Sequence, residues 1–238
     1  MDEKGSFGEE LDFDLGRQVL EEERIDLSDN KEESFNKMFN AGVYCILSIA
    51  DKHSKQESIY DELQYKGLNS PEDIIDMSNI DDFSRILDKA RFPRRKKEYI
   101  FNFSEWWMES PLPEEIYKDV KEDREREFEL RDKIASSPSK NNGAPGLGDC
   151  KSSFFLVKCG YGNVVPIDIV MMRYLDENGY DVKVPDYRKK SGPSPKRYRE
   201  LEDEFIEISE EHNVEPAVLQ ATIWMEGSSY KEKTLEEF

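Results

Sequence analysis

The spacing of apolar residues is the feature of this chain that most limits its fold. From position 35 onward, apolar side chains recur every three or four residues, which places them on one face of an α-helix. The longest stripe contains Phe35, Met38, Phe39, Val43, Ile46, Leu47 and Ala50. Segments that alternate between apolar and polar residues do not exceed about four residues, so no strand is required. The pattern predicts an all-α fold.

Two later segments extend this prediction. Residues 94–110 follow Pro93, which favours a helix start, and carry an aromatic face that we assign to the core. That face consists of Tyr99, Ile100, Phe103, Trp106 and Trp107. Residues 114–136 are dominated by charged side chains and predict one exposed helix.

Composition places the chain among soluble globular proteins. Its 238 residues are 37% apolar and 11% aromatic, enough for a buried core in one or two domains. The longest apolar run, residues 41–50, is far shorter than the roughly 20 residues that cross a bilayer. The acidic start lacks the basic region of a signal peptide. We expect a cytoplasmic protein without membrane contact and without a cofactor. Its three cysteines form no CxxC pair, so they indicate neither a disulfide framework nor a zinc or iron–sulfur site.

Acidic residues are concentrated at both ends. The net charge of −19 arises from residues 1–34, which carry −9, and residues 200–238, which carry −10. We interpret residues 1–34 as an acidic arm, either mobile or a helix that docks on the fold. Residues 35–238 then form one helical domain, with acidic C-terminal helices over 197–238. The neutral body holds two basic clusters, at residues 89–99 and 187–199.

A glycine hairpin is the first candidate functional motif. Residues 143–150, GAPGLGDC, place Gly146, Leu147 and Gly148 between two predicted helices. Glycine permits left-handed backbone angles and lets the amides at a helix start approach an anion such as a DNA phosphate. An ordinary turn between helices is the competing interpretation.

An aspartate at a helix start is the second candidate. Asp168 follows the apolar run 164–167 and lies 18 residues after Cys150. A carboxylate here either caps its own helix or serves as a catalytic group.

This order of parts resembles the helix-hairpin-helix DNA glycosylase superfamily, in which a hairpin L-P-G-V-G-x-K precedes the catalytic aspartate by 18 residues. It is most similar to the archaeal 8-oxoguanine DNA glycosylase/AP lyases, whose hairpin region reads G-x-G-x-K-E-A-S-H-F-L-R-N-V-G-Y. The stretch GLGDCKSSFFLVKCGY matches it at Gly146, Gly148, Ser153, Phe155, Leu156, Gly160 and Tyr161. The segments KARFPRRKKEYI and KRYRELEDEFIEISEEHNVEPAVLQATIW resemble further motifs of these enzymes, so the likeness extends from about residue 35 to Trp224.

The resemblance implies a two-lobed helical fold and a monomeric glycosylase that cleaves the N-glycosidic bond of a damaged purine, such as 8-oxoguanine, in duplex DNA. Asp168 is then the catalytic carboxylate, and Trp224 lies beside the base pocket unless it is a core indole. The residues expected to contact DNA are Gly146, Leu147, Gly148, Arg94, Arg95 and Lys96.

The chain departs from the family at the catalytic lysine. In the family this lysine forms a Schiff base with the sugar and allows strand cleavage, but here the position holds Cys150. A thiol cannot form an iminium ion, so we expect base excision without lyase activity. The neighbouring Lys151 is rotated by about 100° around the helix. It replaces the family lysine only if the hairpin holds an extra residue, and otherwise contacts phosphate or solvent.

The sequence leaves open the role of Cys150 and the identity of the substrate. Cys150 is either an activated thiol in the first turn of a helix or a small apolar filler. The chain continues beyond Trp224 through EGSSYKEKTLEEF, which leaves the recognised base undefined. The protein is alternatively an inactive DNA-binding member of the superfamily, or an enzyme acting on a modified base or a free nucleoside.

Overall fold

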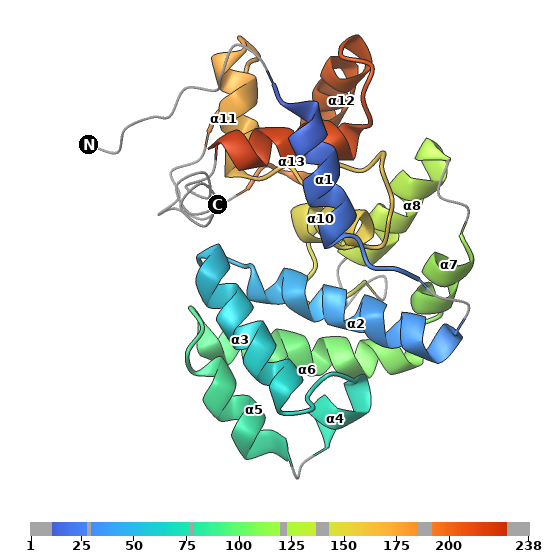
Figure 1. Cartoon of the computed structure of the whole chain (residues 1–238), viewed down its shortest axis with the longest axis vertical. Helices are drawn as coiled ribbons and strands as arrows, with labels where there is room; N and C mark the ends of the chain where they lie inside the picture. Colours follow the sequence, from blue (N-terminus) through green and yellow to red (C-terminus); the bar gives the residue numbers. More distant parts are fainter. Residues whose placement is uncertain are drawn as a thin grey trace. The chain divides into compact units, whose positions relative to one another are not determined.

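The computed structural model describes residues 11–27, 30–76, 79–119, 123–136, 143–184 and 192–227. All twelve elements in these ranges are helices, which confirms the all-α prediction (Figure 1). The chain divides into two compact units. The terminal unit comprises residues 1–24 and 161–238, and the central unit comprises residues 25–160.

Helix α2 lies at the centre of the central unit, where it packs against α3, α6, α7 and α10. In Figure 1 it runs alongside α6. The helices of this unit are α2 (Lys31–Leu47), α3 (His53–Tyr65), α4 (Pro71–Ile75), α5 (Ile80–Leu87), α6 (Pro93–Glu109), α7 (Leu112–Lys118), α8 (Arg124–Ala135) and α10 (Asp149–Lys158).

The faces predicted for α2 and α6 meet in the core. The ring of Phe39 stacks on that of Phe103, with centroids 5.6 Å apart, and Trp107 packs against both rings. A Cβ at Gly42 would lie 2.3 Å from the Phe103 ring, so this close approach of the two helices requires glycine in α2. Ala50, the last residue of the predicted stripe, is exposed beyond the end of α2.

The prediction of a single exposed helix over residues 114–136 is wrong. The chain leaves α7 at Asp119, whose backbone is extended, and enters α8 after Asp123. Leu130 and Ile134 of α8 are buried, because this helix packs against α10. Charged residues on every side of α8 had hidden its apolar face.

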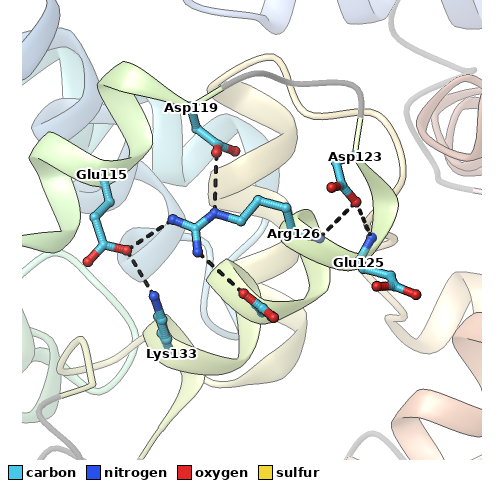
Figure 2. A network of polar contacts seen from close by, with 7 residues as sticks. Glu115, Asp119, Asp123, Glu125, Arg126 and Lys133 are labelled. Atoms are coloured by element: carbon cyan, nitrogen blue, oxygen red, sulfur yellow. Dashed lines mark hydrogen bonds and ion pairs between the residues drawn. The ribbon is translucent and has the colours of Figure 1, made fainter.

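A polar network centred on Arg126 connects α7 to α8 (Figure 2). The Arg126 guanidinium lies 3.2 Å from Glu115, 3.3 Å from Asp119 and 3.3 Å from Glu129. Lys133 also pairs with Glu115, at 2.9 Å. The hydrogen bond from Lys133, supported by Arg126, lowers the pKa of Glu115. The network therefore orients α8, the helix that precedes the glycine hairpin.

The terminal unit consists of α1 (Phe13–Glu23), α11 (Ile169–Glu177), α12 (Pro195–Glu211) and α13 (Pro216–Gly227). Helix α1 packs closely on α13, and a Cβ at Gly16 would lie 2.0 Å from Oγ1 of Thr222. Arg24 anchors the end of α1 by hydrogen bonds to Glu215 at 2.9 Å and to the carbonyl of Tyr161 at 3.3 Å.

Part of the predicted acidic arm is thus a docked helix. Residues 13–23 correspond to the alternative in which this segment packs on the fold, with Leu20 buried. Residues 1–10 lie outside the described residues, as do residues 228–238 of the C-terminal extension.

Candidate functional site

The glycine hairpin connects α8 to α10 in the central unit. Residues 137–142 lie outside the described residues, and the chain rejoins α8 where the Ala144 N–H donates to the carbonyl of Ile134 at 2.8 Å. The Leu147 N–H then donates to the carbonyl of Ala144 at 3.2 Å, closing a β-turn. Pro145 and Gly146 occupy its central positions, and the Gly146 φ of +83° suits a type II turn. The tight glycine turn expected from the sequence is therefore present.

The α10 N-terminus differs from those of α8 and α11. Asp123 and Asp168 cap α8 and α11 with their side chains, whereas the N-cap of α10 is the exposed Gly148, which has no side chain to cap the first turn. Helix N-termini of this kind offer backbone N–H groups and a positive dipole end to an anion. Asp149 places one negative charge in the same turn.

The hairpin packs against a basic segment of α6. A Cβ at Gly146 would lie 3.0 Å from Cβ of Tyr99, so the turn rests directly on this side chain. Arg95 donates from Nε to the Tyr99 hydroxyl at 2.7 Å, and its guanidinium lies 5.2 Å from the centre of the Tyr99 ring. Arg94 and Arg95 are both exposed. Tyr99, which the sequence suggested only as a core aromatic, therefore links an exposed arginine to the hairpin.

Lys96, which was expected from the sequence to contact DNA, is buried inside the central unit. Its side chain is buried, and its ammonium group donates to the carbonyl of Leu47 and to Oδ2 of Asp51, the latter at 2.6 Å. Burial opposes the charged form of Asp51, but hydrogen bonds from Lys96 and the Arg91 N–H outweigh it and lower the pKa of Asp51. In this arrangement Lys96 cannot reach a phosphate, so the expectation of a DNA contact is corrected to a buried ion pair.

Cys150 and Lys151 both lie in the first turn of α10 and are partly exposed. All three cysteines lie in the described ranges, and Cys45 and Cys159 are buried, so Cys150 is the partly exposed one.

The charge of Lys151 acts on Lys96 of α6. Burial lowers the pKa of Lys96 against the opposing effect of Asp51, and the nearby charge of Lys151 lowers this pKa further. The Lys151 ammonium lies 5.5 Å from the centre of the Phe154 ring. The lysine therefore extends along α10 beside other positive charge.

Asp168 is the N-cap of α11 in the terminal unit. Its Oδ1 accepts hydrogen bonds from the N–H groups of Val170, at 2.8 Å, and Met171, at 3.1 Å. The residue is half-buried. The capping role that the sequence allowed is therefore realised. Because the first turn of a helix stabilises negative charge, this position suits an ionised carboxylate.

The remaining candidates are Trp224 and the second basic cluster, residues 187–199. Trp224 lies on α13 and is half-buried. Of the second basic cluster, residues 187–191 lie outside the described residues, and Arg197 pairs with Glu200 at 3.1 Å and Glu204 at 3.2 Å. Acidic neighbours on α12 thus neutralise part of this cluster.

Metal-type clusters and membrane-spanning helices are both absent from the described ranges. These residues contain no group of three or more His, Cys, Asp or Glu side chains that could hold a metal ion. Within the same ranges, no helix is both long and apolar enough to cross a membrane.

Three solved structures, of two 8-oxoguanine DNA glycosylases, share this fold. The enzyme of Methanocaldococcus jannaschii superposes with a TM-score of 0.66 at 22% identity, covering 88% of this chain and 86% of that chain. The Thermotoga maritima enzyme gives 0.67 at 19% identity, covering 89% and 88%. The M. jannaschii 8-oxoguanine glycosylase/lyase in complex with a 15mer DNA containing 8-oxoguanine gives 0.67 at 22% identity, covering 89% and 88%.

The family assignment comes from the sequence match. The helix-hairpin-helix family model described as 8-oxoguanine DNA glycosylase matches residues 21–214, which include the hairpin and Asp168. This match extends over well more than half of the chain. The chain therefore belongs to the 8-oxoguanine DNA glycosylase family of helix-hairpin-helix proteins.

Proposed function

We propose that this protein excises a damaged purine, such as 8-oxoguanine, from duplex DNA by hydrolysis and does not cleave the strand. The observation that carries the proposal is Asp168, a half-buried residue whose carboxylate caps the N-terminus of α11 in a chain of this family. Base excision needs one carboxylate, whereas strand cleavage by a glycosylase/lyase also needs an amine that bonds to the sugar.

The proposed reaction breaks the bond between C1′ of the sugar and the base nitrogen. The nucleotide is extruded from the duplex, and the bonding electron pair leaves with the base, which takes up a proton from the solvent. Positive charge develops on the sugar as an oxocarbenium ion, which the Asp168 carboxylate stabilises. The carboxylate also orients a water molecule and accepts its proton as the water oxygen bonds to C1′. The products are the free base and an abasic site.

We propose that DNA is held by its phosphates at the hairpin and at Arg94 and Arg95. The exposed guanidinium of Arg95 beside Tyr99 and the N-terminus of α10 supply positive potential from adjacent elements. Lys96 has no part in this contact because it pairs with Asp51.

Duplex affinity is expected to fall steeply between about 50 and 200 mM salt, because each neutralised phosphate contributes a slope near −0.9 in a log–log plot. Arg95→Ala should make this slope shallower by about one unit. Fluorescence anisotropy with a labelled duplex measures both quantities. Arg85→Ala is the matched control, since Arg85 pairs with Asp82 on α5, and it should leave the slope unchanged. Salt-independent activity on a nucleoside would instead support the nucleoside alternative.

Cys150→Lys is expected to introduce strand cleavage. We propose that Cys150 stands where the family lysine attacks C1′, and an amine there can form an iminium ion that permits β-elimination. Wild-type protein should yield abasic sites that break only in alkali, whereas the variant should yield broken strands and a covalent adduct trapped by borohydride.

Lys151→Gln serves as the companion variant in the trapping experiment. We expect no trapped adduct from wild-type protein, and therefore no effect of this substitution on trapping. An adduct that forms with wild-type protein and disappears in Lys151→Gln would transfer the Schiff-base role to Lys151 and refute the purely hydrolytic mechanism.

A further inference from the structure

The segment just before Asp168 is buried and belongs to no helix. Residues 164–167 all lie in the interior of the terminal unit and join no helix. Backbone N–H and C=O groups that are removed from water must find other hydrogen-bond partners, since an unpaired group costs about 1–3 kcal/mol. The segment makes one internal bond, from the Ile167 N–H to the carbonyl of Val165 at 2.9 Å, which forms a tight turn around Pro166.

Two side chains of α12 supply further partners. The Tyr198 hydroxyl donates to the carbonyl of Val165 at 2.6 Å and accepts from the Ile167 N–H at 3.1 Å. Oε1 of Glu202 accepts from the Val165 N–H at 3.0 Å. Pro166, between these residues, has no N–H to satisfy. Each of these bonds therefore holds the segment at a defined point of its main chain.

Tyr198 and Glu202 act from one face of α12. They are four residues apart, so their side chains lie one above the other on the helix. Only 2% of Tyr198 and 1% of Glu202 is exposed to solvent. Burying a hydroxyl and a carboxylate is unfavourable unless they are hydrogen-bonded. The bonds to residues 164–167 supply hydrogen-bond partners for the polar groups at these two buried positions.

We infer that Tyr198 and Glu202 are positioning residues for Asp168. The inference rests on the proposed function of Asp168 as the catalytic carboxylate. Asp168 directly follows the anchored segment and is bonded on its other side to the Val170 and Met171 N–H groups. The main chain entering Asp168 and the helix leaving it are therefore both held, which orients the carboxylate. Neither residue touches the substrate in this role.

Single-turnover excision on a lesion-containing duplex tests the role. Tyr198→Phe removes one oxygen, and Glu202→Met removes the acceptor while keeping a long side chain. Each should lower the excision rate by about 10- to 100-fold, because misplacing a reacting group by about 1 Å costs up to this much. The dissociation constant for the duplex should stay within about twofold of wild type. Glu202→Gln retains an acceptor oxygen and should restore most of the rate.

Tyr174→Phe is the matched control for Tyr198→Phe. Tyr174 is a buried tyrosine of the same unit that packs against Phe205, whereas the three bonds from α12 to residues 164–167 involve Tyr198 and Glu202. It should excise at the wild-type rate. A wild-type rate in both Tyr198→Phe and Glu202→Met would overturn the inference, and so would an equal loss in Tyr174→Phe.

Amide hydrogen exchange provides a readout that does not depend on catalysis. The Val170 and Met171 N–H groups donate to Asp168, so a loosened Asp168 should speed their exchange in Tyr198→Phe and Glu202→Met. Leu219 on α13, which donates to the carbonyl of Glu215, is the reference amide and should not change. If wild-type protein excised no lesion, the proposed function would fail, and unchanged exchange at Val170 and Met171 would separately refute the positioning role.

Discussion

Asp168→Asn is expected to lower the rate of base excision by about 10²- to 10⁴-fold, which is the range typical of a positioned acid–base group. Asparagine caps helices about as well as aspartate, so α11 and the stability of the terminal unit should be preserved. The substitution removes only the negative charge and the ability to accept a proton. The measurement is a single-turnover time course on duplexes that carry 8-oxoguanine or other lesions, with alkali used to break the abasic sites.

Asp123→Asn is the matched control for this experiment. Asp123 caps α8 as Asp168 caps α11, with one oxygen accepting from the N–H groups of Glu125, at 3.0 Å, and Arg126, at 3.3 Å. The control should excise at the wild-type rate. An unchanged rate in Asp168→Asn would remove Asp168 from the mechanism. If no lesion yielded alkali-labile sites even with wild-type protein, the inactive DNA-binding alternative would replace the proposed function.

Asp51→Ala should destabilise the protein by about 3–5 kcal/mol, the typical cost of removing one partner from a buried ion pair. The side chains of Lys96 and Asp51 are only 2% and 3% exposed, so water cannot replace the lost carboxylate. The substitution also removes the acceptor of the Arg91 N–H. Urea denaturation followed by circular dichroism measures the change in unfolding free energy.

Two further variants test whether the loss of stability in Asp51→Ala comes from the unpaired buried charge of Lys96. Lys96→Met added to Asp51→Ala removes the stranded ammonium group and should recover part of the lost stability. Asp88→Ala breaks the exposed pair of Asp88 with Lys97 and should cost less than about 1 kcal/mol. A loss in Asp51→Ala as small as that in Asp88→Ala would show that the buried pair contributes little.

The pair of Lys96 and Asp51 predicts that the stability of the folded protein depends on pH. The pKa of Asp51 is lower in the folded protein than its unfolded value of about 3.9. Between the two values the unfolded state binds more protons, so stability increases with pH. The contribution of Asp51 is therefore fully present above the unfolded pKa and is lost as the pH falls through the folded pKa. Denaturation curves of wild-type protein should show this loss in acid, and Asp51→Ala should lack it.

Local chemistry made several features predictable from the sequence. Apolar spacing is a property of neighbouring residues, so it identified α2 and α6 and their buried faces. The Pro145–Gly146 pair predicted a turn because only glycine readily takes a positive φ there. The helix start at Asp168 was predictable because aspartate satisfies the N–H groups of a first turn.

Partners distant in the chain determined the rest. Lys96 and Arg95 are adjacent, yet one meets Asp51, 45 residues away, and the other is exposed beside the hairpin. Tyr198 and Glu202 look like ordinary members of a charged helix, and their role depends on Val165, which lies 33 and 37 residues earlier.

Sequence alone therefore established the helical fold class, the hairpin and the candidate carboxylate, since each depends on residues within a few positions of one another. Tertiary structure was needed to show which charged side chains are buried in pairs and which are exposed. It also revealed that residues 13–23 dock on α13 and that α12 anchors the chain entering Asp168. The physical reason is that burial depends on which helices pack together, and the spacing of residues within one helix does not specify its neighbours.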